Sequence, residues 1–171
     1  YIYTGDGSGR TITNGIDISG EGGLVWIKSR SDANHHQLYD TVRGAGKPLY
    51  SSLTNAEGTN TDFASFTSSG FTLGHTSANG GVNGNATDTY VAWTFRKAPN
   101  FFDVVSYTGT GSERTVSHSL GSTPGMIIVK RTDTSESWSV YHRSANSTSY
   151  VNTLNSDSYE SLDNTHWGTV N

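Results

Sequence analysis

Short apolar segments with strand-like alternation recur along the chain, and they predict an all-β fold. The clearest covers residues 23–30, GLVWIKSR, where β-branched and aromatic residues lie between a glycine and a Ser-Asp-Ala-Asn turn. Val25 and Ile27 alternate with Leu24 and Trp26, so both faces of this segment begin apolar. We expect a central strand in a sheet covered on both faces, or a strand that turns polar only at its end.

Other segments have the composition of strands as well. Residues 63–66 and 70–74 predict a hairpin, because a Ser-Ser-Gly turn separates them. Residues 75–88 are rich in Gly, Asn and Ser, which predicts an exposed loop. No helix longer than one turn is indicated. The remaining predicted strands cover residues 1–3, 10–13, 36–43, 47–53 and 90–95.

The chain also repeats itself. Residues 3–12, YTGDGSGRTI, match residues 107–116, YTGTGSERTV, at seven of ten positions with an offset of 104. After a loop that is two residues shorter, the offset is 102, and LVWIK at 24–28 corresponds to MIIVK at 126–130. A unit of about 100 residues has the size of a small domain rather than of a solenoid repeat.

The repeat predicts two homologous antiparallel β-sandwich copies in tandem, residues 1–99 and 100–171. Residues 24–28, 91–95 and 126–130 are expected to be central strands with buried apolar side chains. The second copy has no counterparts of residues 70–74 and 90–95. We expect these strands in a longer natural polypeptide, of which this sequence is a piece, or from another subunit. Whether the copies form one core or two is left open.

Composition and charge narrow the classes of function. The chain has 11 basic and 15 acidic side chains and a net charge of -4, so nothing in its composition supports nucleic-acid binding. No apolar run approaches the roughly 20 residues that span a bilayer, and we therefore expect no membrane insertion. The chain has 20 glycines, which suits a β protein with many turns.

The residues that could carry metal or acid–base chemistry do not form a recognisable motif. The chain lacks cysteine, and Trp138 stands in the second copy where the first has His36, so His35 and His36 are interpreted as solvated turn residues rather than metal ligands. No GxSxG motif is present. We expect no enzyme activity, no cofactor and no metal. Two carboxylate pairs are candidates for the two groups of a glycosidase: Asp40 with Glu57, and Asp62 with Asp88. Nothing in the sequence places the members of either pair at the required separation, so we do not interpret them as catalytic.

A glycan site is the remaining candidate, and its residues are Asn34, His36, Tyr39 and Arg43. Loops 31–36 and 79–88 offer amides and carboxylates that bind hydroxyl groups, and the predicted strand 36–43 places Tyr39 and Arg43 on one face. The second copy also carries an arginine beside a tyrosine. Solvated turn residues are the alternative interpretation, and most of the four tryptophans are expected in the core.

The motifs YTGxGSxRT, LVWIKSR or MIIVKR, LYDTVRG or VYHRS, SFTSSGFTLG and YVAWTF together resemble the tandem-repeat domain of tail fibre and appendage proteins of bacteriophages, marine phages in particular. The resemblance implies a concanavalin A-like or jelly-roll β-sandwich. It also implies an extracellular, non-enzymatic virion structural protein that contacts other virion proteins and copies of itself, as a homo-oligomer such as a trimer, and attaches to host-surface polysaccharide. It carries over no catalytic residues.

Two further functions stay open beside this one. The chain is alternatively a polysaccharide depolymerase module whose active site lies outside or between the copies, or a capsid decoration or extracellular filament subunit.

Overall fold

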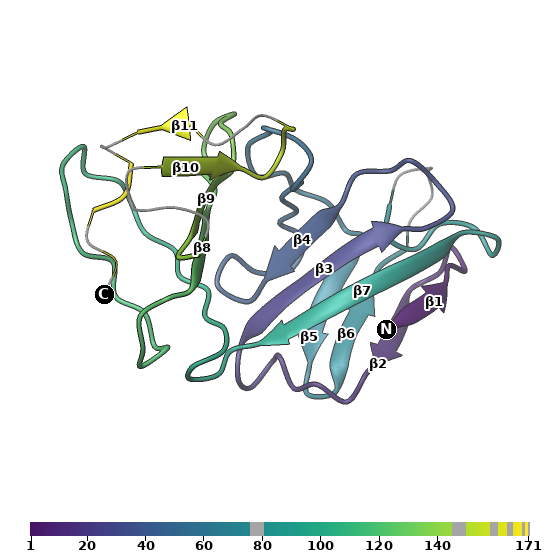
Figure 1. Ribbon diagram of the computed structural model, residues 1–171. Helices are drawn as coiled ribbons and strands as arrows, with labels where there is room; N and C mark the ends of the chain where they lie inside the picture. The colour runs from purple at the N-terminus through teal and green to yellow at the C-terminus, as the bar shows by residue number, and fades with distance from the viewer. Residues whose placement is uncertain (76–80, 145–149, 158–160, 164–165, 169, 171) are drawn as a thin grey trace.

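A computed structural model describes residues 1–75, 81–144, 150–157, 161–163, 166–168 and 170 of the chain (Figure 1). Within these residues the fold contains strands, turns and loops but no helix, and every strand pairing is antiparallel. The strands are β1 (Ile2–Thr4), β2 (Arg10–Thr13), β3 (Gly23–Ser29), β4 (Gln37–Asp40), β5 (Phe63–Thr67), β6 (Gly70–Leu73), β7 (Thr89–Arg96), β8 (Met126–Val129), β9 (Ser139–His142), β10 (Tyr150–Thr153) and β11 (Ser161–Leu162).

Two sheets from the first half of the chain pack face to face and enclose the main core. One has the strand order β1-β7-β3-β4 and the other β2-β6-β5, and Figure 1 shows β5 and β6 behind β3 and β7. The prediction of an all-β fold with sandwich-like packing is therefore confirmed. The core between the sheets consists of Tyr3, Ile12, Ile18, Val25, Ile27, Tyr39, Phe63, Phe71, Leu73, Val82, Tyr90 and Ala92.

Strand β3 lies at the centre of its sheet, as its sequence predicts. It pairs with β7 on one edge and with β4 on the other. Val25 and Ile27 face the main core, where they are 0% and 1% exposed. Leu24 and Trp26 point to the opposite face and pack, partly buried, against a second cluster of apolar residues. Both faces are covered, which explains why the segment carries no polar residue before Lys28.

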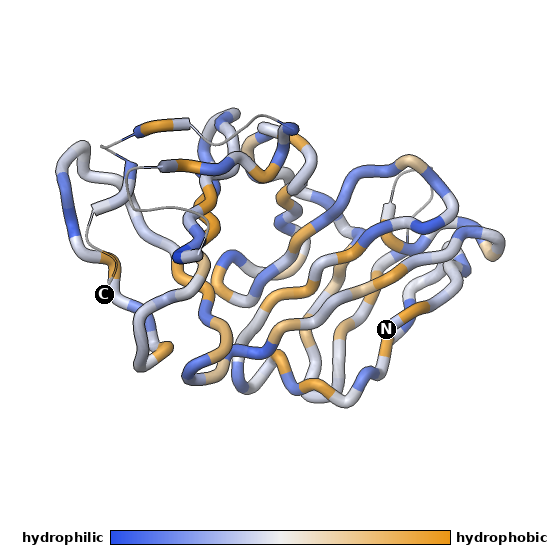
Figure 2. Tube along the Cα trace, viewed as in Figure 1, coloured by the Kyte–Doolittle hydropathy of each residue, from blue (hydrophilic) through white to orange (hydrophobic). Residues whose placement is uncertain are grey.

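The third sheet, β11-β10-β9-β8, belongs to the second half of the chain, and here one prediction is wrong. β8 was expected to be a central, buried strand, yet among the described residues it pairs only with β9 and forms an edge. Met126 is 50% exposed and Ile128 40%. Hydrophobic colour runs along this strand in Figure 2. Its side chains resemble those of β3, but no described strand covers the position that β7 occupies beside β3.

The two halves of the chain contact each other through Trp138. This indole is 4% exposed and packs against Leu38 and Leu49 of the first half. Backbone hydrogen bonds continue the contact on both sides: the amide of Glu136 donates to the carbonyl of Thr54, and the amide of Glu57 to that of Thr132, each over 2.9 Å. The second half therefore rests on the β4 side of the outer face of the first sheet.

Three local predictions need correction. The strand expected at residues 36–43 ends at Asp40, and residues 41–43 form a turn. Only an isolated bridge between Leu38 and Leu49 represents the strand expected at residues 47–53. The loop at residues 75–88 is not wholly exposed, since Asn83 is 0% exposed and its side-chain amide donates to Asp6 over 3.0 Å. Residues 76–80 of that loop lie outside the described residues.

Candidate functional site

Of the four residues predicted to bind a glycan, Tyr39 lies inside the core. Its side chain is 0% exposed, its ring stacks on Phe63 with centroids 4.6 Å apart, and its hydroxyl donates to Oε1 of Gln37. Burial raises the pKa of the Tyr39 hydroxyl above its ordinary value of 10.0. The expectation that this ring offers a stacking surface is therefore wrong, because β4 turns it toward β5.

Arg43 does not lie beside Tyr39 on a strand face, because the strand stops three residues earlier. The carboxylate of Asp40 ends β4: its Oδ1 accepts the backbone N–H groups of Val42 over 3.0 Å and Arg43 over 2.9 Å. Gly44 then adopts a φ of 99°, a left-handed conformation that a glycine takes without strain. The side chain of a single aspartate thus reverses the chain where alternation alone predicts three more strand residues.

The guanidinium of Arg43 is only 11% exposed and its donors are occupied within the protein. It donates to Asp40 over 2.6 Å, to Glu57 over 3.2 Å, and to the backbone carbonyls of Lys47 over 2.7 Å and Leu38 over 3.2 Å. Asp40 and Glu57 therefore do come together, although the sequence gives no sign of it. Arg43 lies between them and forms an ion pair with each carboxylate.

His36 forms a polar pair with Trp26 across the outer face of β3. The indole Nε1–H donates to Nδ1 of His36 over 2.8 Å, and the rings meet edge to face with centroids 5.7 Å apart. An accepting Nδ1 requires the tautomer with the proton on Nε2. Burial, together with the charges of Lys28 and His35, lowers the pKa of His36 below its ordinary value of 6.5. The imidazole is therefore neutral at neutral pH. Asn34 is half-buried in the loop that leads to this pair.

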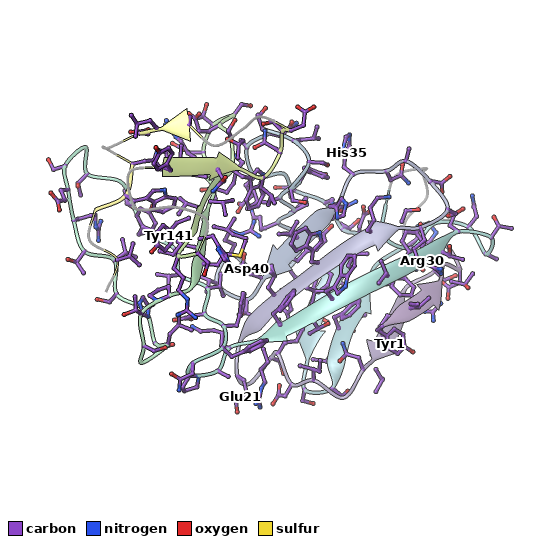
Figure 3. All side chains as sticks on the ribbon, in the orientation of Figure 1. Tyr1, Glu21, Arg30, His35, Asp40 and Tyr141 are labelled. Carbon is purple, nitrogen blue, oxygen red and sulfur yellow. The ribbon has the colours of Figure 1, made fainter. Side chains whose placement is uncertain are left out.

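Next to this pair lies Trp93, the one exposed tryptophan ring on the sheet. It is directly opposite Trp26 in the β3–β7 register, with ring centroids 6.2 Å apart, and 44% of the residue is exposed. We call Trp26, His36 and Trp93 the tryptophan face. Figure 3 shows side chains projecting from this side of β3 and β7, away from β5 and β6. Residues 91–95 were expected to have buried apolar side chains, and at Trp93 this prediction is wrong, because Tyr90 and Ala92 fill the core face of β7 and leave Trp93 on the other face.

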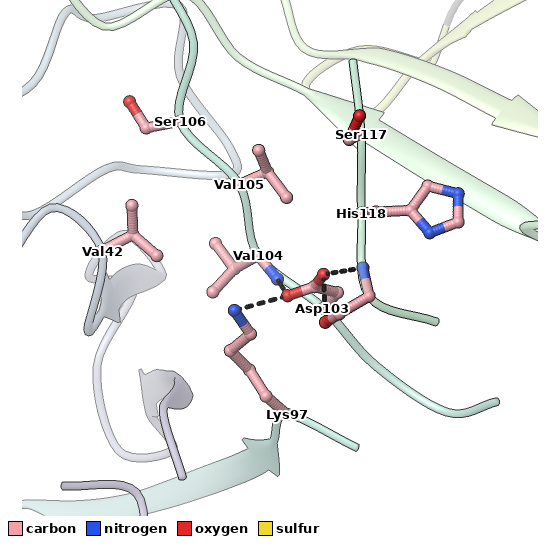
Figure 4. Close-up of a pocket in the computed structure, with 9 residues that line it drawn as sticks. Val42, Lys97, Asp103, Val104, Val105, Ser106, Ser117 and His118 are labelled. Carbon is pink, nitrogen blue, oxygen red and sulfur yellow. Dashed lines mark hydrogen bonds and ion pairs between the residues drawn. The ribbon is translucent and has the colours of Figure 1, made fainter. Parts of the chain in front are cut away.

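A second concave region lies at the junction of the two halves and has a volume of about 400 Å³. Figure 4 shows Asp103 among the lining residues, with its carboxylate facing Lys97. The Asp103 side chain is 5% exposed, pairs with Lys97 over 2.7 Å, and accepts the amide of Ser119 over 2.7 Å, the hydroxyl of Ser119 over 2.8 Å and the amide of Val104 over 2.8 Å.

The electrostatics of Asp103 indicate a structural clamp. Burial by itself raises its pKa, but the Lys97 ammonium and the hydrogen bonds from Ser119 and Val104 together hold the pKa well below its ordinary value of 3.8. The carboxylate therefore stays charged and is saturated by four donors. It fixes the junction between β7 and the following segment instead of exchanging protons with a substrate.

The described residues contain neither a cluster that could bind a metal ion nor a membrane-spanning helix. Within the described residues, no three or more His, Cys, Asp or Glu side chains converge in a way that could hold a metal ion. His35 and His36 point to different partners, since Nδ1 of His35 lies 3.0 Å from the hydroxyl of Ser52. A search of the described residues found no helix that could cross a membrane.

Comparison with known proteins places the chain in a family. A family described as Domain of unknown function (DUF7483) matches residues 1–171, the whole length of the chain. The search of curated proteins found no match, and neither did the search of solved structures.

Proposed function

We propose that this chain, which belongs to the DUF7483 family of domains of unknown function, is a non-enzymatic structural and adhesive module of an extracellular bacteriophage tail fibre or appendage. In this proposal its two halves are homologous β-sandwich copies of the concanavalin A-like or jelly-roll kind, and the module assembles with other virion proteins and with copies of itself, as a trimer. The repeated motifs and the all-β fold support it.

The observation that carries an adhesive role is the exposed ring of Trp93 beside Trp26 and His36. A flat indole on a rigid sheet matches the apolar face of a sugar ring, and a neutral imidazole supplies an N–H donor for hydroxyl groups. The face is fixed before any ligand arrives, because Trp26 is held by its hydrogen bond to His36. Such preorganisation lowers the entropic cost of binding.

Single-site affinity on such a face is expected to be weak. Each hydrogen bond exchanged with water contributes about 0.5–1.5 kcal/mol, so one sugar residue binds in roughly the millimolar range. Many copies on one particle raise the effective affinity by orders of magnitude without a new contact. A weak site repeated on a multi-subunit fibre therefore suits reversible attachment to a polysaccharide surface.

Retention of the full chain on host capsule and lipopolysaccharide tests the proposal. We expect Trp93→Ala to abolish retention, Trp93→Tyr to keep part of it, and Tyr107→Ala, which removes another ring that is 47% exposed, to leave it unchanged. Equal melting temperatures would show that the fold is intact. Retention that is insensitive to Trp93 would overturn the assignment of the face, and steady release of reducing ends would overturn the non-enzymatic proposal in favour of a depolymerase.

A further inference from the structure

We propose that the free edge of β8 binds a β-strand of the β7 type presented by a partner polypeptide, which completes the third sheet. The proposal is independent of glycan binding. It starts from the pairing of β8 with β9, which reproduces the pairing of β3 with β4. All four residue pairs agree at the offset of 102: Leu24↔Asp40 with Met126↔His142, Val25↔Tyr39 with Ile127↔Tyr141, Trp26↔Leu38 with Ile128↔Val140, and Ile27↔Gln37 with Val129↔Ser139.

This agreement defines which edge of β8 is open. β3 uses one edge for β4 and the other for β7. Because β8 uses the equivalent of the β4 edge for β9, its unpaired edge is the equivalent of the one that holds β7. An open edge presents a row of backbone donors and acceptors and is a template for an added strand.

The residues preceding β8 also lack the strand that their counterparts in the first half pair with. Tyr107 is the counterpart of Tyr3, yet Tyr3 is 5% exposed and Tyr107 47%. Residues 103–125 contain no strand, although residues 107–116 repeat the sequence of a segment that forms β1 and β2. In the first half, β1 pairs with β7 alone and β2 with β6 alone. The sequence of this segment is therefore suited to the strand conformation. What it lacks among the described residues is a strand to pair with.

The turn within this segment is already in place. Arg114 donates to the carbonyl of Thr108 over 2.7 Å, just as Arg10 donates to Thr4 over 2.7 Å. The guanidinium of Arg114 also lies 5.9 Å from the ring centre of Tyr107, against 5.8 Å between Arg10 and Tyr3. Local contacts thus preorganise the segment to add a further strand to the incoming one, as β1 does on β7.

The β3–β7 register specifies the chemistry of the occupant. Across from Leu24, Val25, Trp26 and Ile27, β7 places Phe95, Thr94, Trp93 and Ala92. A strand in the same register on β8 would place aromatic residues opposite Met126 and Ile128. It would place small residues opposite Ile127 and Val129. A second copy of this chain is not the occupant, because its described β7 is already paired on both edges, with β1 and β3. We assign the site to a β7-type strand of another polypeptide, and a longer natural chain whose residues after 171 protect β8 from exchange would overturn that assignment.

A synthetic peptide with the sequence of residues 86–99, ATDTYVAWTFRKAP, tests the site on the full chain. We expect saturable binding, and amide hydrogen exchange of residues 126–129 slowed by about tenfold or more while exchange in β3 and β7 is unchanged. A scrambled peptide and one with lysine at the position of Trp93 should not bind. Ile128→Lys should weaken binding at least tenfold, and because Ile128 is 40% exposed the free chain should tolerate it.

Four results obtained with this chain would overturn the proposal. Binding that leaves the exchange of residues 126–129 unchanged would place the peptide elsewhere. Protection of β3 instead of β8 would show displacement of the resident β7. Dimerisation of the chain without peptide, seen by sedimentation and accompanied by protection of β8, would make a second copy the occupant. Absence of binding at peptide concentrations up to about a millimolar would show that the edge is closed to strands of this type.

Discussion

The indole nitrogen of Trp138 donates a hydrogen bond to the backbone carbonyl of Tyr50 over 2.9 Å, across 88 positions of sequence. The same N–H lies 3.1 Å from the carbonyl of Leu53, so one donor serves two carbonyl groups of the turn that follows Leu49. Around it, Leu38 and Leu49 form the floor of a cluster in which the ring is 4% exposed. This single side chain therefore contributes both a polar and an apolar contact between the two halves.

Truncation of Trp138 should uncouple the halves. We expect Trp138→Ala to lower the free energy of unfolding by about 3–5 kcal/mol, because a large ring leaves a cavity in the contact. Trp138→Phe should cost less, about 1–3 kcal/mol, since it mainly removes the donor from two carbonyls. Chemical denaturation followed by circular dichroism measures both. Trp138→Ala with unchanged stability would mean that the halves do not stabilise each other in solution.

The sequence predicted strands better than it predicted their neighbours. β3 and β7 were identified as strands from their own residues, but the alternation in β7 did not show which of its faces is buried, since Trp93 is 44% exposed. β8 carries the same kind of residues as β3 but is an edge strand, and that depends on whether a β7-type strand lies beside it. Trp138 aligns with His36, so no local pattern could show that it docks onto the other half.

The candidate site failed for a similar reason. Alternation places Tyr39 and Arg43 on one face, but it cannot say which face is buried, nor that Asp40 ends the strand by binding the next amides. Trp93 was in the predicted strand, yet its exposure follows from the packing of the two sheets on the opposite face. His36 is the predicted site residue that contacts Trp26, whose ring in turn meets the exposed ring of Trp93.

The pair of Trp26 and His36 should make stability depend on pH. His36 has a lowered pKa in the folded chain, so the unfolded chain binds a proton more readily. Its contribution to stability is then fully present above the unfolded value of 6.5 and is lost as the pH falls from there toward the lowered folded pKa. We expect the free energy of unfolding to decline in that window. In His36→Gln, where an amide oxygen replaces the accepting nitrogen, the decline should be smaller.

His35→Gln is the matched control, since His35 is exposed and makes no bond to Trp26. Denaturation curves at pH 5, 6, 7 and 8 for the three proteins give the comparison. A wild-type curve that is as flat as that of His36→Gln would contradict the neutral, accepting imidazole.

Asp103 should also make stability depend on pH, in a more acidic range than His36. Its folded pKa is depressed, so its stabilising effect is present above the unfolded value of 3.8 and is lost as the pH falls through the folded value. Asp103→Asn should lower the free energy of unfolding at pH 7 by about 1.5–3 kcal/mol, because a charge-assisted pair with Lys97 disappears. The difference in free energy of unfolding between the two proteins should shrink as the pH falls below the pKa of the unfolded carboxyl group.

Asp133→Asn controls for the general effect of removing a carboxylate. Asp133 also pairs with an arginine, Arg131, over 2.7 Å, but its side chain is 71% exposed. Exposed pairs contribute little to stability, so this variant should unfold like the wild type. If Asp103→Asn and Asp133→Asn behaved alike, Asp103 would not be a clamp.

Arg43 offers the sharpest test of the site that the sequence suggested. Arg43→Met keeps the length of the side chain but leaves Asp40, whose side chain is 5% exposed, without its cation. Removing one member of a buried ion pair costs about 3–5 kcal/mol, so we expect a loss of that size in thermal or chemical denaturation, and Arg43→Lys should recover only part of it because lysine lacks the planar fork.

Arg30→Met, at an exposed position, should be neutral. Combining Arg43→Met with Asp40→Asn should cost less than the sum of the single changes, since the stranded charge is then gone. Additive losses, or an Arg43→Met chain with wild-type stability and weakened polysaccharide retention, would return Arg43 to the surface as a ligand-binding residue.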